Sequence, residues 1–388
     1  MKKKIGIITT FKANNYGAEL QAYATQQKLR SLGYEAELID YLFYKNRRYK
    51  YTKGAKPWTH FTLRQRLKHY ALYRLLLPII EIVGILVCKQ IRERKRRFEV
   101  FHEQHSHLSR TYYSQEELYH AKMNYDVYCV GSDQVWNPAT AVSMEPYFLA
   151  FAPSDAKKIS YASSFGVASV PSETIEKYKR GLANLDRISC REAQGVNLVR
   201  LLTGREAAHV LDPTLLLDGN EWRNVSEYTF CPQKGKYILL YNIAELSVIY
   251  TLARRISKET GWPIVKLCKR AIFLKRHERV QNVPTAGPAD FVGMIDNAGI
   301  FLTNSFHGIA FALNLETPFW VVLDENMKNN SRMVSLLSLL GLQNRILALD
   351  EGIDKVDYQT PIDFHRVNGL LEKERQKSLC YLRSAIED

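Results

Sequence analysis

The chain has 388 residues, of which 46% are hydrophobic and 24% charged, and its formal net charge at pH 7 is +14. This composition excludes a disordered or fibrous chain, and the length predicts two domains. The charge is concentrated, because residues 43–110 hold seventeen Lys or Arg and four Glu, a net +13. The rest of the chain is therefore close to neutral. This distribution argues against a nucleic-acid binder and predicts a local anionic partner.

The cysteines and the N-terminus indicate a cytoplasmic protein. Six cysteines are scattered along the chain, and none forms a CxxC pair. We therefore expect reduced thiols and no metal site. The basic start, Met1-Lys2-Lys3-Lys4, is followed by only about five apolar residues, too few for a secretory signal peptide. We expect this apolar run to be a buried strand.

Residues 4–42 predict a strand over 5–9, a helix over 19–32 and a strand over 37–41. The turn before the helix contains Asn15 and Gly17, and glycine permits a close backbone approach. Such a turn lies at the carboxyl end of a strand and at a helix start, where α/β proteins bind ligands and backbone N–H groups attract anions. The spacing is not GxGxxG, so no dinucleotide fingerprint is present, and a plain turn is the alternative.

The basic segment that follows contains a nearly apolar stretch at 71–88, with basic clusters at 64–68 and 92–97. A membrane-spanning helix is disfavoured, because the stretch is short and contains Arg74, Glu81 and Pro78. An apolar face with basic flanks is typical of a helix lying on an anionic membrane surface. We assign that role to residues 61–97. A helical hairpin buried against the domain or a second copy remains the alternative.

The α/β pattern resumes with strands predicted at 125–130, 158–162 and 187–190. Ser132, Asp133 and Trp136 follow the first of them. A carboxylate at a strand end can orient a sugar hydroxyl or act as a base, although Asp133 could instead cap a helix with Trp136 packed beneath it.

Two further candidates follow the later strands of this half. Gly166 lies after the strand at 158–162, and Arg191 comes directly after the strand at 187–190. Arginine recognises carboxylates and phosphates with two parallel hydrogen bonds. A surface pair with Glu192 is the alternative for Arg191.

A second α/β unit begins near residue 236, with strands predicted at 237–241, 263–267, 300–303 and 318–322. Asn304, Ser305, His307 and Gly308 lie between the strand at 300–303 and the next helix. A histidine at a helix start can hold a phosphate or act as a general acid, whereas a structural histidine is the alternative. Arg332 lies near another helix start and could contact the same anion or simply be solvated.

Several of these motifs, in this order, resemble the polysaccharide pyruvyl transferase family. They are Asn-Tyr-Gly-Ala-x-Leu-Gln-Ala-Tyr-Ala at 15–24, Gly-Ser-Asp-Gln-Val-Trp-Asn at 131–137, Tyr-Ala-x-Ser-Phe-Gly at 161–166, Arg-Glu at 191–192, Leu-Asp-Pro-Thr at 211–214 and Thr-Asn-Ser-Phe-His-Gly at 303–308.

The resemblance implies an α/β fold of two Rossmann-like domains facing a central cleft, as in GT-B enzymes, with a basic helical insertion in the first domain. We expect the first domain at 1–217, including the insertion at about 43–110, and the second at 218–345. A helical tail at 346–388 would pack back on the first domain. The implied reaction transfers a pyruvyl group from phosphoenolpyruvate to a polyprenyl-linked oligosaccharide or a polysaccharide, with no other cofactor, at the inner face of the cytoplasmic membrane.

Characterised members resemble one another in an Arg-Leu-His motif that binds the donor, and the matching positions here are Ser305, Phe306 and His307. The histidine carries over, whereas serine stands at the arginine position. We therefore predict His307 as acid or phosphate ligand and Asp133 as acceptor-side base.

The remaining predicted site residues form two groups. The donor would contact Asn15, Gly17, Arg191, Asn304, Ser305, Gly308 and Arg332, and the acceptor would contact Ser132, Trp136 and Gly166. The serine at position 305 also favours a second hypothesis, a GT-B-like glycosyltransferase that uses a nucleotide sugar. A non-catalytic, membrane-docked assembly component is a third.

Overall fold

In the computed structural model, the described residues are 2–42, 46, 48–50, 89–139, 144–268, 280–324, 330–348 and 356–388. They form two compact units, the first from residues within 1–88, 103–216 and 375–388, and the second from residues within 89–102 and 217–374. We expected the whole basic insertion in the first domain, but residues 89–102 belong to the second unit. The apolar stretch predicted at 71–88 lies outside the described residues.

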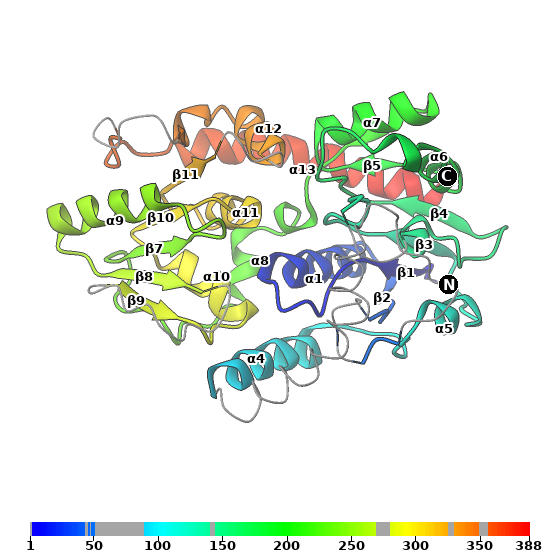
Figure 1. The fold of residues 1–388 in the computed structure, drawn as a ribbon, viewed down its shortest axis with the longest axis horizontal. Helices are drawn as coiled ribbons and strands as arrows, with labels where there is room; N and C mark the ends of the chain where they lie inside the picture. Colours follow the sequence, from blue (N-terminus) through cyan, green and yellow to red (C-terminus); the bar gives the residue numbers. More distant parts are fainter. Residues whose placement is uncertain are drawn as a thin grey trace. The chain divides into compact units, whose positions relative to one another are not determined.

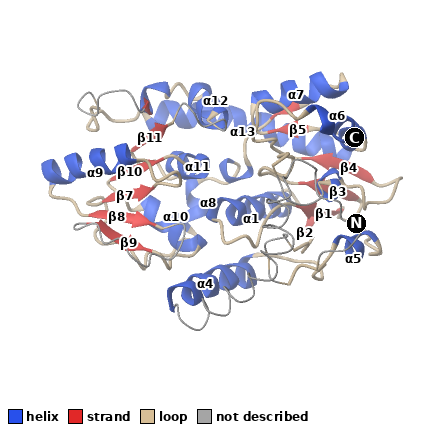
Figure 2. Cartoon of the chain, viewed as in Figure 1, coloured by secondary structure: helices blue, strands red, loops and turns tan. Residues whose placement is uncertain are grey.

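The first unit is built on a parallel sheet of order β2-β1-β3-β4 (Figures 1 and 2). The short β5–β6 pair extends this sheet, since isolated parallel bridges join Ile159 to Arg187 and Ser163 to Cys190. The chain therefore runs outward in both directions from β1 and β3, which makes their carboxyl ends the point where strand order reverses. The strands are β1 (Lys4–Ile8), β2 (Glu35–Leu38), β3 (Val127–Val130), β4 (Lys157–Ser160), β5 (Ser189–Cys190) and β6 (Ala208–His209).

Helices pack against this sheet and its loops. The C-terminal half of the last helix belongs to the unit: the Tyr381 hydroxyl donates to the Ser160 carbonyl at 2.9 Å, and Ser378 Oγ accepts the Leu211 N–H at 2.9 Å. The helices are α1 (Tyr16–Ser31), α5 (Gln115–Tyr119), η2 (Glu145–Phe148), η3 (Ser172–Thr174), α6 (Ile175–Ala183), α7 (Ala193–Thr203), η4 (Pro213–Leu215) and the end of α13 (Phe364–Glu387).

The second unit contains a six-stranded parallel sheet of order β12-β11-β10-β7-β8-β9 (Figures 1 and 2). This is the doubly wound order, with the reversal between β7 and β10. Right-handed crossovers on the two sides of that point place α9 and α11 on opposite faces of the sheet. The strands are β7 (Ile238–Tyr241), β8 (Ile264–Leu267), β9 (Val280–Val283), β10 (Ile300–Thr303), β11 (Phe319–Leu323) and β12 (Ile346–Ala348).

The helices of this unit are α8 (Gly219–Arg223), α9 (Ser247–Thr260), α10 (Pro288–Asp296), α11 (Phe306–Asn314), α12 (Ser331–Leu339), η5 (Gln343–Arg345) and the first part of α13. The expectation of two Rossmann-like units is confirmed by the parallel order of both sheets.

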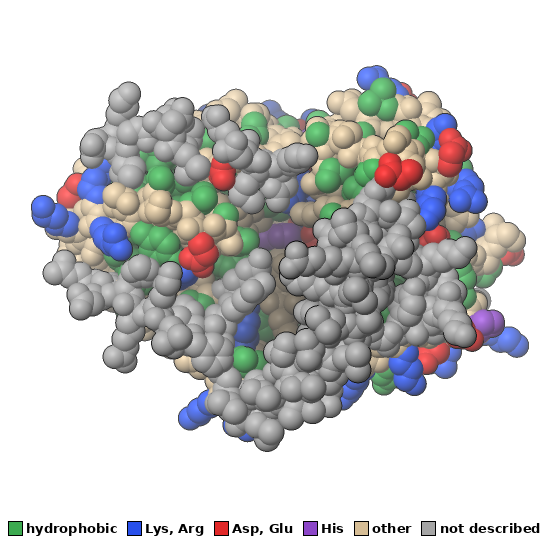
Figure 3. All heavy atoms as spheres, in the orientation of Figure 1, with side chains coloured by type: hydrophobic (Ala, Val, Ile, Leu, Met, Phe, Trp, Pro, Cys, Tyr) green, Lys and Arg blue, Asp and Glu red, His purple; other side chains and the backbone are tan. Residues whose placement is uncertain are grey.

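The basic helix α4 (Lys89–His105) contributes its first part to the second unit. Arg94 is buried and donates to the Cys268 carbonyl at 3.0 Å, and Arg97 lies 3.0 Å from a carboxylate oxygen of the buried Asp290. Both arginines lie in the segment predicted to face a membrane, so that prediction is corrected for these two. On the face drawn in Figure 3, basic and acidic side chains of the described residues are interspersed. Across the described ranges, no helix has the length and apolar character that a membrane span requires.

A candidate active site at the carboxyl ends of the parallel strands

Backbone strain is concentrated in the loops that follow β1, β3, β4 and β7. Lys12, Asn14, Asp133, Ala162 and Glu245 all have positive φ, between 52° and 71°. This region costs a non-glycine residue on the order of 1–3 kcal/mol, and such strain clusters at ligand-binding sites. The strained loops lie at the sheet edge where doubly wound folds bind their ligands. This edge of each unit is therefore the place to look for a site.

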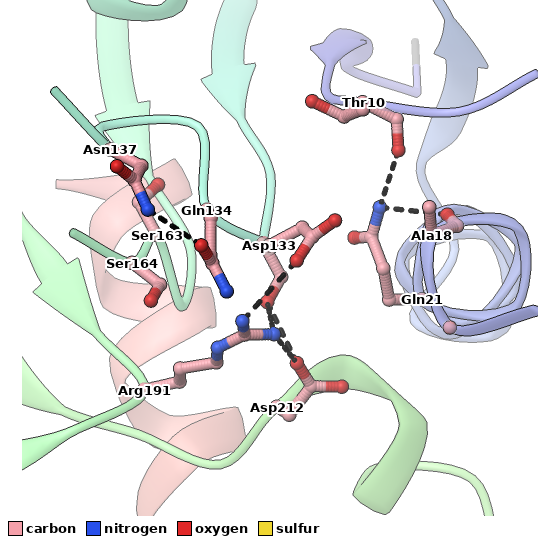
Figure 4. A network of polar contacts seen from close by, with 12 residues as sticks. Thr10, Ala18, Gln21, Asp133, Gln134, Asn137, Ser163, Ser164, Arg191 and Asp212 are labelled. Atoms are coloured by element: carbon pink, nitrogen blue, oxygen red, sulfur yellow. Dashed lines mark hydrogen bonds and ion pairs between the residues drawn. The ribbon is translucent and has the colours of Figure 1, made fainter. Parts of the chain in front are cut away.

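In the first unit, the buried guanidinium of Arg191 organises that edge (Figure 4). Arg191 has no exposed side-chain surface, and its Nη1 lies 2.8 Å from Asp212 Oδ2. Its Nη2 lies 3.3 Å from Asp133 Oδ1. The Ser132 hydroxyl donates to the same Asp212 oxygen at 2.8 Å. Ser132 and Asp133, Arg191, and Asp212, which come from three separate parts of the sequence, are thereby held together behind the ends of β3 and β5.

The charge of Arg191 is fully engaged in this network. Burial alone would lower the pKa of Arg191, but Asp212, Asp133 and Glu192 outweigh it and raise the pKa above its ordinary value. The guanidinium stays charged and is compensated by carboxylates. The prediction that Arg191 contacts a substrate anion is therefore corrected, because its charge is already balanced inside the protein. Ser132 is also fully buried and is not part of an acceptor surface.

Asp133 is held at the surface by this network. Its side chain is 19% exposed, with Oδ1 on Arg191. Its carbonyl accepts the Ser164 N–H at 3.0 Å, which fixes the turn in its left-handed conformation. Among the described residues, no hydrogen bond is made by the second carboxylate oxygen. Asp133 thus presents an oriented oxygen at the end of β3, which is the geometry that a general base or hydroxyl acceptor requires.

The start of α1 is already capped. Asn15 is the N-cap, and its Oδ1 accepts the Gly17 N–H at 3.0 Å. The prediction that this N–H binds an anion is corrected, since the asparagine side chain occupies it. The sequence analysis missed Gln21 one turn further on. Its amide nitrogen donates to Thr9 Oγ1 at 3.0 Å, and Thr9 Oγ1 donates to the Ser132 carbonyl at 2.8 Å. This chain of contacts ties α1 to the Asp133 turn.

Trp136 and Gly166 have different roles. Trp136 is fully buried, stacks on Phe148 with ring centroids 5.6 Å apart, and donates its indole N–H to the Tyr147 carbonyl at 2.8 Å. It is a core residue, so its prediction as an acceptor contact is corrected. Gly166 has φ +63°, and a Cβ there would lie 2.7 Å from the Gln134 side chain. Glycine at 166 allows that close packing beside the site.

In the second unit, Asn304 connects the ends of β7 and β10. Its Oδ1 accepts the Ile243 N–H at 2.7 Å, and its Nδ2 donates to Asn242 Oδ1 at 2.9 Å. Ser305 is the N-cap of α11, and its hydroxyl accepts the Gly308 N–H at 3.3 Å. Asn304, Ser305 and Gly308 therefore shape this turn. The Gly308 N–H is occupied by Ser305, which corrects its prediction as an anion donor.

His307 and Arg332 lie around one aromatic ring. His307 is in the first turn of α11 and half-buried, and its ring centroid is 5.4 Å from that of Phe306. The Arg332 guanidinium, from the first turn of α12, lies over the same Phe306 ring at 5.9 Å. The structure thus brings together an imidazole and an arginine at the carboxyl edge of the second sheet. A cation and a histidine beside a helix N-terminus suit an anion.

The predicted residues therefore form two sets, one in each unit. Ser132, Asp133 and Arg191 meet in the first, together with Asp212, which the sequence analysis quoted in a motif without giving it a role. His307 and Arg332 meet in the second. Within the described residues, no three His, Cys, Asp or Glu side chains are grouped so that they could hold a metal ion.

Comparisons with known proteins agree with this architecture. A family model described as polysaccharide pyruvyl transferase matches residues 15–326. No curated protein matches the chain significantly. Among solved structures, an α-glucosyltransferase in complex with UDP and a 13-mer DNA is 9% identical, with a TM-score of 0.50 over 98% of this chain and 95% of that chain. A UDP-GlcNAc 2-epimerase from Methanocaldococcus jannaschii is 13% identical, with a TM-score of 0.46 over 96% and 92%.

Proposed function

Because the chain belongs to the polysaccharide pyruvyl transferase family, we propose that it moves a pyruvyl group from phosphoenolpyruvate to two hydroxyls of one sugar. The sugar belongs to a polyprenyl-linked oligosaccharide or a polysaccharide that becomes part of a cell-surface polymer. Two C–O bonds form at C2 of the donor, and its C–O bond to phosphate breaks. One hydroxyl proton ends on the methylene carbon, which becomes a methyl group, and the other leaves with phosphate.

The second unit supplies the donor side of this proposal. Phosphoenolpyruvate carries a phosphate and a carboxylate, so its site needs a cation and hydrogen-bond donors. Arg332 is the cation on the Phe306 ring beside His307, and this placement supports it as the counterpart of the arginine that Ser305 replaces. His307 then binds the phosphate or protonates the methylene carbon.

The first unit supplies the base. The observation that carries this assignment is the Arg191–Asp133 contact at 3.3 Å, which fixes one oxygen of a carboxylate whose side chain is 19% exposed and leaves the other oxygen outside that contact. A base held by a positioned partner needs no reorganisation at the moment of proton transfer. Arg191 and Asp212 are therefore positioning residues, and Asp133 is the residue that removes a hydroxyl proton.

A second candidate is a glycosyltransferase that uses a nucleotide sugar. It is favoured by Ser305 at the position of the family arginine, and the α-glucosyltransferase with a similar fold was solved in complex with UDP. A membrane-docked component without catalysis is the third candidate. For every candidate, we propose that the protein lies at the inner face of the cytoplasmic membrane, with the 61–97 segment, apart from Arg94 and Arg97, on anionic lipid.

Thermal denaturation with added donor tests the proposal. A ligand at a hundredfold its dissociation constant stabilises by about 2.7 kcal/mol, which raises the melting temperature of a unit of this size by roughly 5–10 °C. We expect this rise with phosphoenolpyruvate and not with UDP-glucose. Arg332→Met should abolish it. Arg345→Met is the matched control, because Arg345 is also buried and also lies over an aromatic ring, that of Trp320.

Turnover is measured as phosphate released from phosphoenolpyruvate in the presence of methyl hexosides. His307→Ala and Asp133→Asn should each reduce it at least a hundredfold, as expected for loss of a general acid or base, while melting stays close to that of the parent protein. A rise in melting temperature with UDP-glucose alone would select the glycosyltransferase instead. Unfolding of His307→Ala would make that histidine structural.

A further inference from the structure

One buried polar atom beside Asp133 has no role in the fold. Gln21 has no exposed surface, and among the described residues its Oε1 has no hydrogen-bond partner. An unsatisfied buried acceptor costs a folded protein about 1–3 kcal/mol. Gln26, five residues further along α1, is equally buried but fully bonded, since its Oε1 accepts the His107 N–H at 2.9 Å. The difference is local to Gln21.

The orientation of the Gln21 amide is set by its neighbours. Its nitrogen lies 3.0 Å from Thr9 Oγ1, 3.3 Å from the Thr10 carbonyl and 3.0 Å from the Ala18 carbonyl. Two of these are carbonyl oxygens, which only accept hydrogen bonds, so the nitrogen must face them and the oxygen must face away. In Figure 4, the amide nitrogen lies toward Thr10 and the oxygen lies toward the turn of Asp133.

The Asp133 turn therefore offers two oxygens and no available positive charge. Asp133 contributes the carboxylate oxygen that Arg191 does not hold, and Gln21 contributes its amide oxygen. Arg191 is compensated by Asp212, and the Gly17 N–H is taken by Asn15. Oxygens that only accept hydrogen bonds select ligands that donate them. A phosphate or carboxylate would meet repulsion here, whereas a sugar hydroxyl would satisfy both atoms.

We propose that Gln21 Oε1 and Asp133 Oδ2, the carboxylate oxygen that Arg191 does not contact, together bind two hydroxyl groups of a single sugar. Under the proposed function, on which this inference rests for its catalytic meaning, these are the two hydroxyls that form the ketal. Asp133 takes the proton from one, and Gln21 orients the other. Gln21 thus determines acceptor specificity, because a sugar must present a pair of neighbouring hydroxyls to contact both Gln21 and Asp133.

The loop between β1 and α1 contacts Gln21, and the proposal requires a neighbouring segment to move because Gln21 is buried. Gln21 is covered in this structure, and its nitrogen is bonded to Thr10 in that loop. The loop also holds Lys12 and Asn14 at positive φ. A strained loop in contact with this side chain is easier to move than a relaxed one, because the movement releases strain and the incoming hydroxyl supplies the missing hydrogen bond. Sugar binding should therefore change the exchange behaviour of this loop.

The test measures the binding of methyl galactoside, methyl glucoside and methyl mannoside to the full chain. Ligand-observed NMR monitors the binding, and no donor is present. We expect at least one to bind at millimolar concentration. Inorganic phosphate should not compete, and the corresponding sugar lacking one hydroxyl of the pair should bind more weakly. Gln21→Met should weaken binding by roughly 2- to 10-fold, the effect of one neutral hydrogen bond. Gln26→Met is the matched control and should leave the affinity unchanged.

Hydrogen exchange on the parent protein gives an independent readout should Gln21→Met fail to fold. Glycoside binding should alter exchange in residues 9–15 and 131–134. Equal affinity of Gln21→Met and the parent, competition by phosphate, absence of glycoside binding, or exchange changes confined to other segments would each overturn the inference. Because no donor is present, these outcomes are distinct from failure of the pyruvyl transfer assay.

Discussion

Replacement of Asp212 by alanine is the most direct test of the network that holds the first site. Asp212 Oδ2 accepts from Arg191 and Ser132, both at 2.8 Å, and its Oδ1 accepts from the Thr214 N–H at 3.0 Å and hydroxyl at 2.7 Å. The Arg191 and Asp212 side chains are both fully buried. Asp212→Ala therefore leaves a buried guanidinium without its closest carboxylate.

The magnitude follows from burial. Removing one partner of a buried ion pair costs about 3–5 kcal/mol, because the other charge remains desolvated. Asp133 at 3.3 Å still compensates Arg191 in part, so we expect the lower end, about 3 kcal/mol. For a unit of this size, this lowers the melting temperature by roughly 6–12 °C. Differential scanning calorimetry measures the change in melting temperature, and urea denaturation measures the change in the free energy of unfolding.

The paired control is Arg191→Met with Asp212→Leu. Replacing both charges by apolar side chains is often neutral, so the double variant should recover most of the stability lost by Asp212→Ala. It should not recover turnover, because Asp133 then lacks the contact that orients it. If Asp212→Ala lowered the free energy of unfolding by less than about 1 kcal/mol, as expected for an exposed ion pair, the conclusion that this network is buried and stabilising would be refuted. Full activity of the double variant would refute the claim that the network orients Asp133.

Two further predictions concern the surroundings of the same site. Gly166 has φ +63°, and Gly166→Ala places a Cβ 2.7 Å from the Gln134 side chain, whereas Gly204 has φ +70° and no atom within 4 Å of the Cβ that Gly204→Ala adds. We therefore expect Gly204→Ala, the control, to lower the free energy of unfolding by about 1 kcal/mol and Gly166→Ala by roughly 2 kcal/mol or more, as measured by urea denaturation. Equal losses would contradict the packing argument. Burial raises the pKa of Cys129 to about 12, whereas Cys380 is exposed. A disulfide reagent at mildly alkaline pH should therefore modify Cys380 rapidly and Cys129 only on unfolding. Cys380→Ala, the control, should remove one rapidly reacting thiol.

The positions of most strands follow from local signals in the sequence. The apolar runs that became β1, β3, β7 and β10 are buried throughout or nearly so, and each is followed by a turn that the sequence marks with Asn, Ser, Asp or Gly. The strand β12 was missed because it has only 3 residues. The strand β9 was missed because its sequence, VQNV, has polar residues in the middle, and it lies at the sheet edge. Pairing with the neighbouring strand, rather than composition, makes them strands.

The sequence places the candidate residues in the turns after the strands, but it does not show which groups each side chain contacts. Arg191 was expected to face a ligand, yet its partners Asp212 and Ser132 are 21 and 59 residues away. Trp136 had an equally valid alternative as a core residue, and its burial and its contacts with Tyr147 and Phe148 decide for the core. Gln21 lies within a quoted motif, but its significance depends on which amide atom is left unbonded. These contacts depend on the packing of residues that are far apart in the sequence, which local sequence patterns do not show.

The substitution of the family arginine by Ser305 has a structural reason that bears on donor binding. Ser305 is the N-cap of α11, and its hydroxyl accepts the Gly308 N–H. An arginine at this position cannot cap the helix and would cost about 0.5–2 kcal/mol. Under the proposed function, the positive charge for the donor then comes from another element. We propose Arg332 of α12 for this role, since it lies over the ring of Phe306, the residue between Ser305 and His307. The helix keeps its cap, and the imidazole keeps a neighbouring cation.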